Sequence, residues 1–374
     1  MPQKVLLKDL LFNPQKVARI AREIEHAHPS FKTDWFVRDV TARFPELELK
    51  ARIGWITNCL GTYLPSDYRR AVSILLSSLP AEADPELSDN DFGDFIYAPY
   101  ADYVAKHGCN ERNLDFSLQS LKEITTRASA EDAIRPFLNA FPEQTLNALT
   151  EWSKDIHYHV RRLCSEGTRP KLPWSQKITI PITTPIPILD NLFYDKTRFV
   201  IRSVANHMND ISKIDPDLTI KTLKRWRASG KQNPKDMEYI VRHALRTLVK
   251  HGNPEAMRLL GYSHEPAVHV KNFTVPESVA MNSALDFSFM VCAEEDTDII
   301  ADYIIRFQNK AGKLNSQKVF KLKTLSLQKG QSVILSKRHM FREGMTTRTL
   351  FHGRHELEIQ INGKRYGKKS FQLE

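Results

Sequence analysis

Carboxylates on two predicted helices are the side chains in this sequence best suited to catalysis. Glu166 falls in the last turn of a helix, where the helix dipole favours a cation over a carboxylate. Asp210 falls well inside a second helix, over 199–213, where aspartate has poor helical propensity and caps nothing. Residues that break local rules indicate function, because local stability does not account for them. Each acid also has an ordinary explanation as a solvent-exposed ion pair, such as Arg162–Glu166, which contributes only about 0.3–0.5 kcal/mol.

The helix that carries Glu166 combines a packing face with a polar face. Ser153 or Asp155 is placed to cap this helix, and Gly167 is placed to end it. Three side chains on the polar face follow i, i+3 and i+7 spacing: His159, Arg162 and Glu166. The segment runs from Trp152 to Trp174 and has two prolines in its final turn, which argues against a face that is merely solvated.

A second polar face and a third acid extend the set of candidates. Asn206, Asp210 and Lys213 follow i, i+4 and i+7 spacing on the second helix. Glu131 lies two residues after Ser129, which has capping-box spacing to Asp132, with Asp in place of the usual Glu or Gln. This segment therefore has a strong structural explanation. Glu131 is the weaker of the three acids, and either it or Asp132 could face a site.

Basic residues on and near these helices are suited to contact a DNA backbone. One further predicted helix carries a basic stripe on one face, formed by Tyr239, Arg242, Arg246 and Lys250. The basic candidates on the first helix and in the turn after it are Arg161, Arg169 and Lys171. We predict that these residues contact DNA together with the polar faces described above.

Helices must position these side chains, because apolar residues recur with helical spacing through the first two-thirds of the chain. Prolines repeatedly stand at expected first helical positions. The five segments are Phe44-Pro45-Glu46, Phe141-Pro142-Glu143, Asp215-Pro216-Asp217, Asn233-Pro234-Lys235 and Asn253-Pro254-Glu255. Helix pairs about 35–40 residues apart, such as 132–165 and 197–227, resemble an α-solenoid of the HEAT type. We predict that this all-α HEAT-like solenoid covers residues 1–264. An ordinary helical bundle would show similar spacing.

From about residue 267 the apolar period changes to two, which predicts an all-β domain over residues 268–374. About seven short strands in this length fit an immunoglobulin-like sandwich better than a barrel. Asn362-Gly363 predicts a type I′ hairpin, because both turn positions need a positive φ. The protein is therefore expected to be multidomain, with an all-α solenoid followed by an all-β immunoglobulin-like sandwich.

The charge balance favours a polyanionic partner. Lys and Arg number 54 against 44 acids, a formal net charge of +10. Residues 303–374 hold 16 basic residues and four acids, and basic loops around Lys337-Arg338, Arg342 and Lys364-Arg365 are predicted to contact phosphates. Lysines that keep edge strands from aggregating would account for part of this excess.

Several classes of protein lack support in the sequence. No apolar run approaches the ~20 residues of a membrane helix, and the N-terminus does not have the pattern of a secretory signal. The four cysteines lie far apart, and no metal-ligand cluster, nucleotide-binding glycine loop or Ser-His-Asp pattern is present. We expect a monomer without metal or cofactor, in the cytoplasm and associated with the nucleoid when bound to DNA.

Taken together, these residues resemble the AlkC branch of the AlkC/AlkD DNA alkylation-repair glycosylases. The most specific match is the run HVRRLCSEGTRPKLPW at 159–174, and supporting matches include SAEDAIRPFL, SVANHMNDISK and VRHALRTLVKHG. The resemblance covers residues 6–262 and implies a HEAT-like fold. Some members of the family carry an immunoglobulin-like C-terminal domain.

The resemblance implies a DNA glycosylase of base excision repair that acts on double-stranded DNA with cationic alkylated bases. These bases are 3-methyladenine, 3-methylcytosine and 1-methyladenine. It also implies that Glu166, Asp210 and Glu131 are catalytic, that Arg162 contacts phosphate or holds Glu166, and that the base is not flipped. We separately expect Trp174 to lie against the lesion or its sugar. The AlkD branch has a tryptophan in the segment that corresponds to 203–213, which this sequence lacks. For this reason only the carboxylates and Arg162 are carried over from the family.

Two other functions are compatible with the same pattern. HEAT solenoids often serve as binding platforms, so the chain could be a non-catalytic DNA-binding HEAT-repeat scaffold. It could also be a solenoid that binds peptides or proteins. DNA binding that ignores the acids would indicate the scaffold, and binding to unmodified duplex with a steep salt dependence would argue against the peptide binder.

Overall fold

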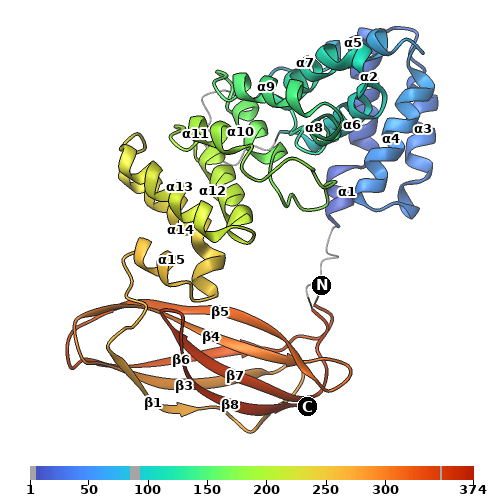
Figure 1. Ribbon diagram of the computed structural model, residues 1–374. Helices are drawn as coiled ribbons and strands as arrows, with labels where there is room; N and C mark the ends of the chain where they lie inside the picture. The colour runs from blue at the N-terminus through green and yellow to red at the C-terminus, as the bar shows by residue number, and fades with distance from the viewer. Residues whose placement is uncertain (1–5, 85–92, 346–347) are drawn as a thin grey trace. The chain divides into compact units, whose positions relative to one another are not determined.

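The computed structural model describes residues 6–84, 93–345 and 348–374 (Figure 1). Its helices precede its strands along the chain, as the periodicity predicts. By internal contacts the chain divides into two compact units. One unit contains the residues up to Ile211 together with Arg225–Ala244, and the other contains Ser212–Lys224 and Leu245–Glu374. The predicted boundary at 264–268 falls between the last helix and the first long strand and remains a prediction.

The helical region contains α1 to α15, joined by loops and brief 3-10 turns, with a long connection over 168–185 between α10 and α11. The helices are α1 (Leu7–Leu11), α2 (Pro14–Ala27), α3 (Thr33–Ala42), α4 (Leu49–Tyr63), α5 (Tyr68–Ser77), α6 (Ala98–Gly108), α7 (Leu114–Thr125), α8 (Ile134–Ala140), α9 (Pro142–Trp152), α10 (Tyr158–Gly167), α11 (Ile186–Leu192), α12 (Arg198–Ser212), α13 (Pro216–Ser229), α14 (Pro234–Lys250) and α15 (Pro254–Leu259).

Local sequence signals account for many of these helix starts. Proline occupies the first helical position of α9, α13, α14 and α15, where its missing N–H costs no hydrogen bond. The Asn253 side chain caps α15 by accepting from the Ala256 amide at 2.9 Å. These predicted starts are confirmed. Pro45 is the exception, because it lies in a 3-10 turn at Phe44–Glu46.

Apolar faces of consecutive helices pack against one another to form the helical core. The contacts join α2 with α3, α3 with α4, α6 with α7, α8 with α9, and α10 with both α9 and α11. Fully buried aromatic side chains include Phe36, Phe137 and Phe199. Packing between sequence neighbours is typical of helical-repeat proteins. The HEAT designation itself remains a prediction. In the described part of the chain, no helix has the length and apolar composition needed to cross a membrane.

The strand-rich region forms two sheets. Its strands are β1 (Val268–Thr274), β2 (Ser278–Val279), β3 (Ala284–Ala293), β4 (Thr297–Gln308), β5 (Leu314–Leu327), β6 (Ser332–Met340), β7 (Gly353–Ile361) and β8 (Lys364–Leu373). One sheet has the order β1-β3-β6 and the other has the order β2-β8-β7-β4-β5. Side chains from both sheets, such as Phe289 on β3 and Ile305 on β4, share one apolar core, which makes this region a sandwich.

The hairpin between β7 and β8 forms at the predicted turn. Asn362 has φ 47° and Gly363 has φ 82°, as a type I′ turn requires. The Asn362 side chain also donates from Nδ2 to the Ser263 carbonyl oxygen at 2.8 Å. Turn chemistry and strand alternation thus agree across this region, where the sequence predicts about seven strands and the described residues form eight, β1 to β8.

Candidate active site

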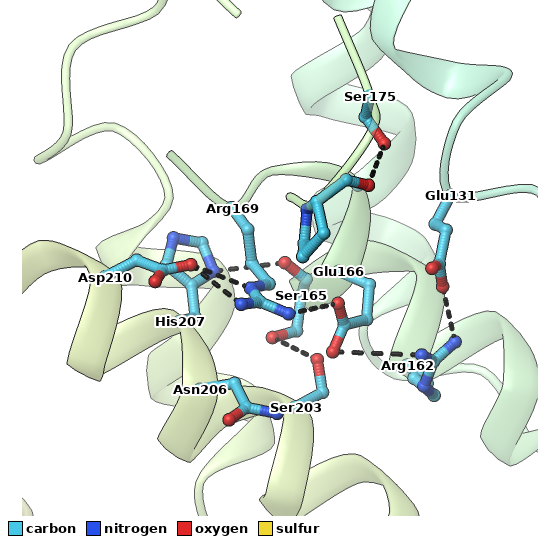
Figure 2. A network of polar contacts seen from close by, with 12 residues as sticks. Glu131, Arg162, Ser165, Glu166, Arg169, Ser175, Ser203, Asn206, His207 and Asp210 are labelled. Carbon is cyan, nitrogen blue, oxygen red and sulfur yellow. Dashed lines mark hydrogen bonds and ion pairs between the residues drawn. The ribbon is translucent and has the colours of Figure 1, made fainter. Parts of the chain in front are cut away.

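Helices α10 and α12 carry the two acids that the sequence analysis singles out (Figure 2). Helix α10 begins later than predicted, with His157 in the N-cap position, so the expected caps at Ser153 and Asp155 are wrong. Asp155 Oδ1 instead accepts from the His157 amide at 2.8 Å, and Ser153 follows the end of α9. A hydrogen bond of this kind, from a backbone amide to a nearby aspartate side chain, competes with helix formation. Helix α10 therefore begins only at Tyr158.

Gly167 ends α10 as predicted, and its lack of a side chain serves a further purpose. A Cβ at this position would lie 2.5 Å from Ile134 Cγ2, so the glycine allows α8 and α10 to approach closely. This close approach brings the end of α10, with Glu166, beside the start of α8.

Glu166 and Asp210 are buried and bound to one arginine. They are 3% and 2% exposed, so the interpretation as solvent-exposed ion pairs is wrong. Arg169 donates from Nη1 to Glu166 Oε2 at 2.8 Å and from Nε to Asp210 Oδ2 at 3.0 Å. Burial alone would lower the pKa of Arg169, but the two carboxylates outweigh it and raise that pKa.

Glu131 joins the same group of charges through Arg162. Arg162 Nη1 lies 2.7 Å from Glu131 Oε2, and Arg162 Nη2 lies 3.8 Å from Glu166 Oε1. The capping box predicted for Ser129 and Asp132 is wrong. Ser129 Oγ donates to Glu131 at 2.6 Å, and α8 begins at Ile134 without a side-chain cap.

The three acids therefore lie in one chain of contacts: Glu131, Arg162, Glu166, Arg169 and Asp210 (Figure 2). We call these five residues the acid–arginine chain. Buried carboxylates held by guanidinium groups have fixed positions, so their charges are already oriented before any substrate arrives. Such an arrangement can stabilise positive charge that develops on a bound molecule.

A second layer of polar contacts fixes α10 against α12 beneath the acids. Ser203 Oγ donates to Ser165 Oγ at 2.8 Å, and His207 Nδ1 lies 3.0 Å from the Ser165 carbonyl oxygen (Figure 2). Burial lowers the pKa of His207 to about 3, so its imidazole is neutral and donates from Nδ1. No sequence pattern singles out these three residues, because a single polar residue inside an amphipathic helix forms no motif and has no characteristic spacing.

The turn after α10 presents a large apolar side chain to solvent. Trp174 is 78% exposed, and its backbone has φ 62°, a conformation that costs free energy for a residue other than glycine. Lys50 Nζ donates to the Trp174 carbonyl oxygen at 2.6 Å and also pairs with Asp132. Lys171 in the same turn is exposed. An exposed tryptophan on a turn that is held by a hydrogen bond from Lys50 is suited to contact a planar or apolar partner.

Two predicted DNA-contacting residues already have partners within the protein. His159 is 3% exposed, with its Nδ1 3.0 Å from the Thr125 carbonyl oxygen. Arg161 pairs with Asp195 at 2.5 Å and also donates to the carbonyl oxygens of Asp155 and Ile156. DNA contacts by these two residues remain predictions.

The remaining predicted contacts lie on α12 and α14 or directly after α12. Asn206 Oδ1 lies 2.8 Å from His243 Nε2, and Arg242 pairs with Glu238 at 2.6 Å. Lys213, which follows α12, is exposed, and Arg246 is half-buried. Their contacts with DNA remain predictions. Within the described ranges, no group of three or more His, Cys, Asp or Glu side chains could hold a metal ion.

Comparisons with known proteins cover almost the whole chain. Residues 269–374 match the family described as "Uncharacterised protein YhaZ, C-terminal Ig-like domain". YhaZ of Bacillus subtilis is 30% identical over 368 residues, which are 97% of this chain and 98% of that protein. The structure of the alkylpurine DNA glycosylase AlkC of Pseudomonas fluorescens, bound to DNA containing an abasic site analog, superposes with a TM-score of 0.88. The two chains are 32% identical, and the match covers 99% of this chain and 100% of that one.

These matches confirm the predicted fold class, a helical region followed by an immunoglobulin-like domain. Both relatives match over nearly their full lengths, so the match includes the segments that carry the acid–arginine chain. The chain belongs to the AlkC branch of the AlkC/AlkD DNA alkylation-repair glycosylases, with a C-terminal immunoglobulin-like domain of the YhaZ type.

Proposed function

We propose that this protein is a DNA glycosylase of base excision repair that hydrolyses the N-glycosidic bond of cationic alkylated bases. The bases are 3-methyladenine, 3-methylcytosine and 1-methyladenine, and the partner is double-stranded DNA. The observation that carries the proposal is the convergence of Glu131, Glu166 and Asp210 in one acid–arginine chain. The similarity to a DNA-bound alkylpurine glycosylase supports the same reaction class.

The chemistry of these bases explains why carboxylates suffice. An alkylated base that already carries positive charge is a good leaving group, so no general acid needs to protonate it. The sugar develops oxocarbenium character as the bond breaks, and anionic groups stabilise it. At an effective dielectric of about 20 and a separation of ~4 Å, one carboxylate–cation contact contributes about 4 kcal/mol before desolvation. Two or three such contacts account for a large part of a glycosylase's acceleration.

The acids differ in their access to a substrate. The Glu131 side chain keeps 27% of its surface exposed, whereas those of Glu166 and Asp210 keep 5% and 3%. We assign Glu131 to direct contact with the lesion, and Glu166 and Asp210 to stabilising the sugar cation and orienting water. The two buried acids are already paired with Arg169 between α10 and α12. We further propose that excision proceeds without base flipping, as the family resemblance implies.

DNA contacts in this proposal come from both parts of the chain. Trp174 lies against the lesion or its sugar, and Arg162 orients Glu131 while facing the DNA. The immunoglobulin-like domain binds phosphates through Lys337 and Arg338 on β6, both of which are exposed. Lys364 and Arg365 already pair with Glu265 and Glu358 and contribute less.

The test is release of methylated bases from methylated genomic DNA. The purified protein is incubated with this DNA in EDTA, and free bases are quantified by mass spectrometry. A sample without protein corrects for spontaneous depurination. Release of 3-methyladenine would support a glycosylase that does not need a metal. Retained DNA binding without any release would support the non-catalytic scaffold instead.

A further inference from the structure

Arg135, at the start of α8, is almost completely buried at 1% exposure. Its guanidinium donates to three backbone carbonyl oxygens. Nη1 lies 2.9 Å from the Gly167 oxygen and 2.9 Å from the Arg169 oxygen, and Nε lies 2.6 Å from the Gln176 oxygen. Arg135 thus binds both ends of the segment 167–176, which connects the end of α10 with the residues beyond Trp174.

A buried guanidinium is costly, and this one is used to hold backbone. Removing a charge from water costs several kcal/mol unless its hydrogen bonds are replaced, and carbonyl oxygens replace them here. One of these oxygens belongs to Gly167, the last residue of α10, where a nearby cation also interacts favourably with the helix dipole. Arg135 therefore compensates for the unfavourable position of Glu166 in the last turn of the same helix.

The segment held by Arg135 carries two groups of the proposed site. Arg169, whose carbonyl oxygen Arg135 binds, joins Glu166 to Asp210 through its own side chain. Trp174, two residues before Gln176, is exposed on a backbone with φ 62°. A backbone of this conformation persists only where surrounding contacts hold it. Here Lys50 binds the Trp174 carbonyl oxygen, Ser175 bonds to Leu172 and Asp132, and Arg135 binds the Gln176 carbonyl oxygen.

We infer that Arg135 is a positioning residue for the proposed glycosylase reaction, on which this inference rests. It fixes the segment 167–176 so that the Arg169 guanidinium stays between the two buried acids and Trp174 stays directed at the DNA. It does not touch the substrate, because its donors are directed at backbone oxygens and its side chain is buried. Its effect on the reaction is transmitted through the placement of Arg169 and Trp174.

Arg52 provides a matched control in another part of the helical region. It is 3% exposed and likewise donates to backbone carbonyl oxygens, among them those of Phe12 at 2.8 Å and Phe44 at 2.8 Å. Arg52 belongs to α4, and the elements that it joins carry none of the proposed catalytic residues. Arg52→Met and Arg135→Met therefore both remove a buried guanidinium that binds backbone, but only Arg135→Met removes direct bonds to the segment 167–176.

The experiment combines two measurements on the full-length wild-type protein, Arg135→Met, Arg135→Lys and Arg52→Met. The first is amide hydrogen exchange of peptides that cover 167–177. The second is single-turnover release of 3-methyladenine at a temperature where circular dichroism shows all four proteins folded. We expect Arg135→Met to accelerate exchange in these peptides and to slow release on the order of 100-fold, as a displaced catalytic group does. Arg135→Lys should be intermediate, and Arg52→Met should match the wild type in both measurements.

The outcomes separate this inference from the proposed function. Unchanged exchange at 167–177 in Arg135→Met would overturn the positioning role, whatever the release assay gives. Faster exchange with wild-type release would also overturn it, because an ordered segment would then not be needed for the reaction. No release by the wild-type protein would overturn the proposed glycosylase activity itself, and the catalytic part of this inference with it.

Discussion

The carboxylates of Glu166 and Asp210, on α10 and α12, are joined by the single guanidinium of Arg169. Arg169 Nη1 lies 2.8 Å from Glu166 Oε2, and Nη2 lies 2.9 Å from Asp210 Oδ2. Two negative charges are thereby held close together inside the protein, at a cost that their shared cation offsets. This geometry leads to predictions that separate a catalytic role of the acids from a structural one.

Glu166→Gln and Asp210→Asn should each slow single-turnover release of 3-methyladenine about 100-fold, because each removes one preorganised charge from the transition state. The affinity for unmodified duplex should change less than about twofold, since neither acid is exposed. Rapid-quench kinetics with excess protein measures the first quantity and fluorescence anisotropy the second. Glu48→Gln is the control, because the Glu48 side chain is 84% exposed and pairs only at the surface with Lys8. Wild-type rates in both active-site variants would refute the assignment.

Arg169→Met should destabilise the protein by about 3–5 kcal/mol, because it leaves two buried carboxylates without their shared cation. Urea denaturation followed by circular dichroism measures this loss. Adding Glu166→Gln and Asp210→Asn to the same chain should recover most of the stability but not the activity. A loss below about 1 kcal/mol for Arg169→Met alone would contradict the buried network.

Trp174→Ala should leave the melting temperature unchanged, because the side chain is 78% exposed. The same substitution should lower the affinity for DNA or the rate of 3-methyladenine release by about 10- to 100-fold. This is the range expected when one stacking contact with a base is lost. Trp35→Ala is a matched control, since Trp35 is 55% exposed on α3 and stacks with Arg38. Equal effects of the two substitutions would show that a general loss of exposed aromatic surface is responsible.

The buried carboxyl group of Asp302 should make the stability of the immunoglobulin-like domain depend on pH. Burial raises the pKa of Asp302 to about 6, although Lys321 and Lys250 partly oppose the shift. A raised pKa means that the folded state holds the proton more tightly, so stability falls as pH rises from about 4 to 6. Asp302→Asn should therefore stabilise the protein at pH 7.5 by up to about 3 kcal/mol and have little effect near pH 4.

Glu356→Gln is the control of opposite sign. Hydrogen bonds from Arg306 and Lys368 hold the pKa of Glu356 below its usual value despite burial, which by itself raises it. This substitution should destabilise the protein at neutral pH, with an effect that fades as pH falls through the carboxylate range. Urea denaturation at several pH values measures both variants. The same pH trend in both would contradict the assignments.

Lys337→Glu combined with Arg338→Glu should weaken binding to unmodified duplex and reduce the slope of log affinity against log salt by about two. Each removed phosphate contact releases about one counterion fewer. Lys364→Glu combined with Arg365→Glu should have a smaller effect, because these residues pair with acids at 2.5 and 3.1 Å, whereas Arg338 lies 4.0 Å from Asp286. Salt titrations by anisotropy measure the slopes. Identical slopes for both double variants would place the phosphate contacts elsewhere.

Features that depend on neighbouring residues were predictable from the sequence. Proline at the first position of α9 and α15 and the Asn362-Gly363 turn both appear where expected. Their energetics involve only a few consecutive residues, so local patterns are sufficient. The change from helical to strand period likewise reports which faces are buried in each element.

The site was predictable only where a residue broke a local rule. Glu166 and Asp210 were identifiable because neither stabilises its own helix, and the structure brings them together through Arg169. Glu131 lies between Ser129 and Asp132, whose spacing is that of a capping box. Tertiary packing overrides this local pattern, because Arg162 Nη1 lies 2.7 Å from Glu131 Oε2. His159 shares the spacing of Arg162, yet it is turned into the core against Thr125.

Local patterns were enough to predict the succession of helices and strands, the two fold classes and the acids that no helix needs. Tertiary structure alone decided which of these acids meet, since 44 residues separate Glu166 from Asp210 and only the packing of α10 on α12 closes that distance. It also decided the role of Arg135, whose partners are backbone oxygens 32 to 41 residues away. Backbone oxygens are the same in every residue, so no sequence pattern can reveal which of them a buried arginine will bind.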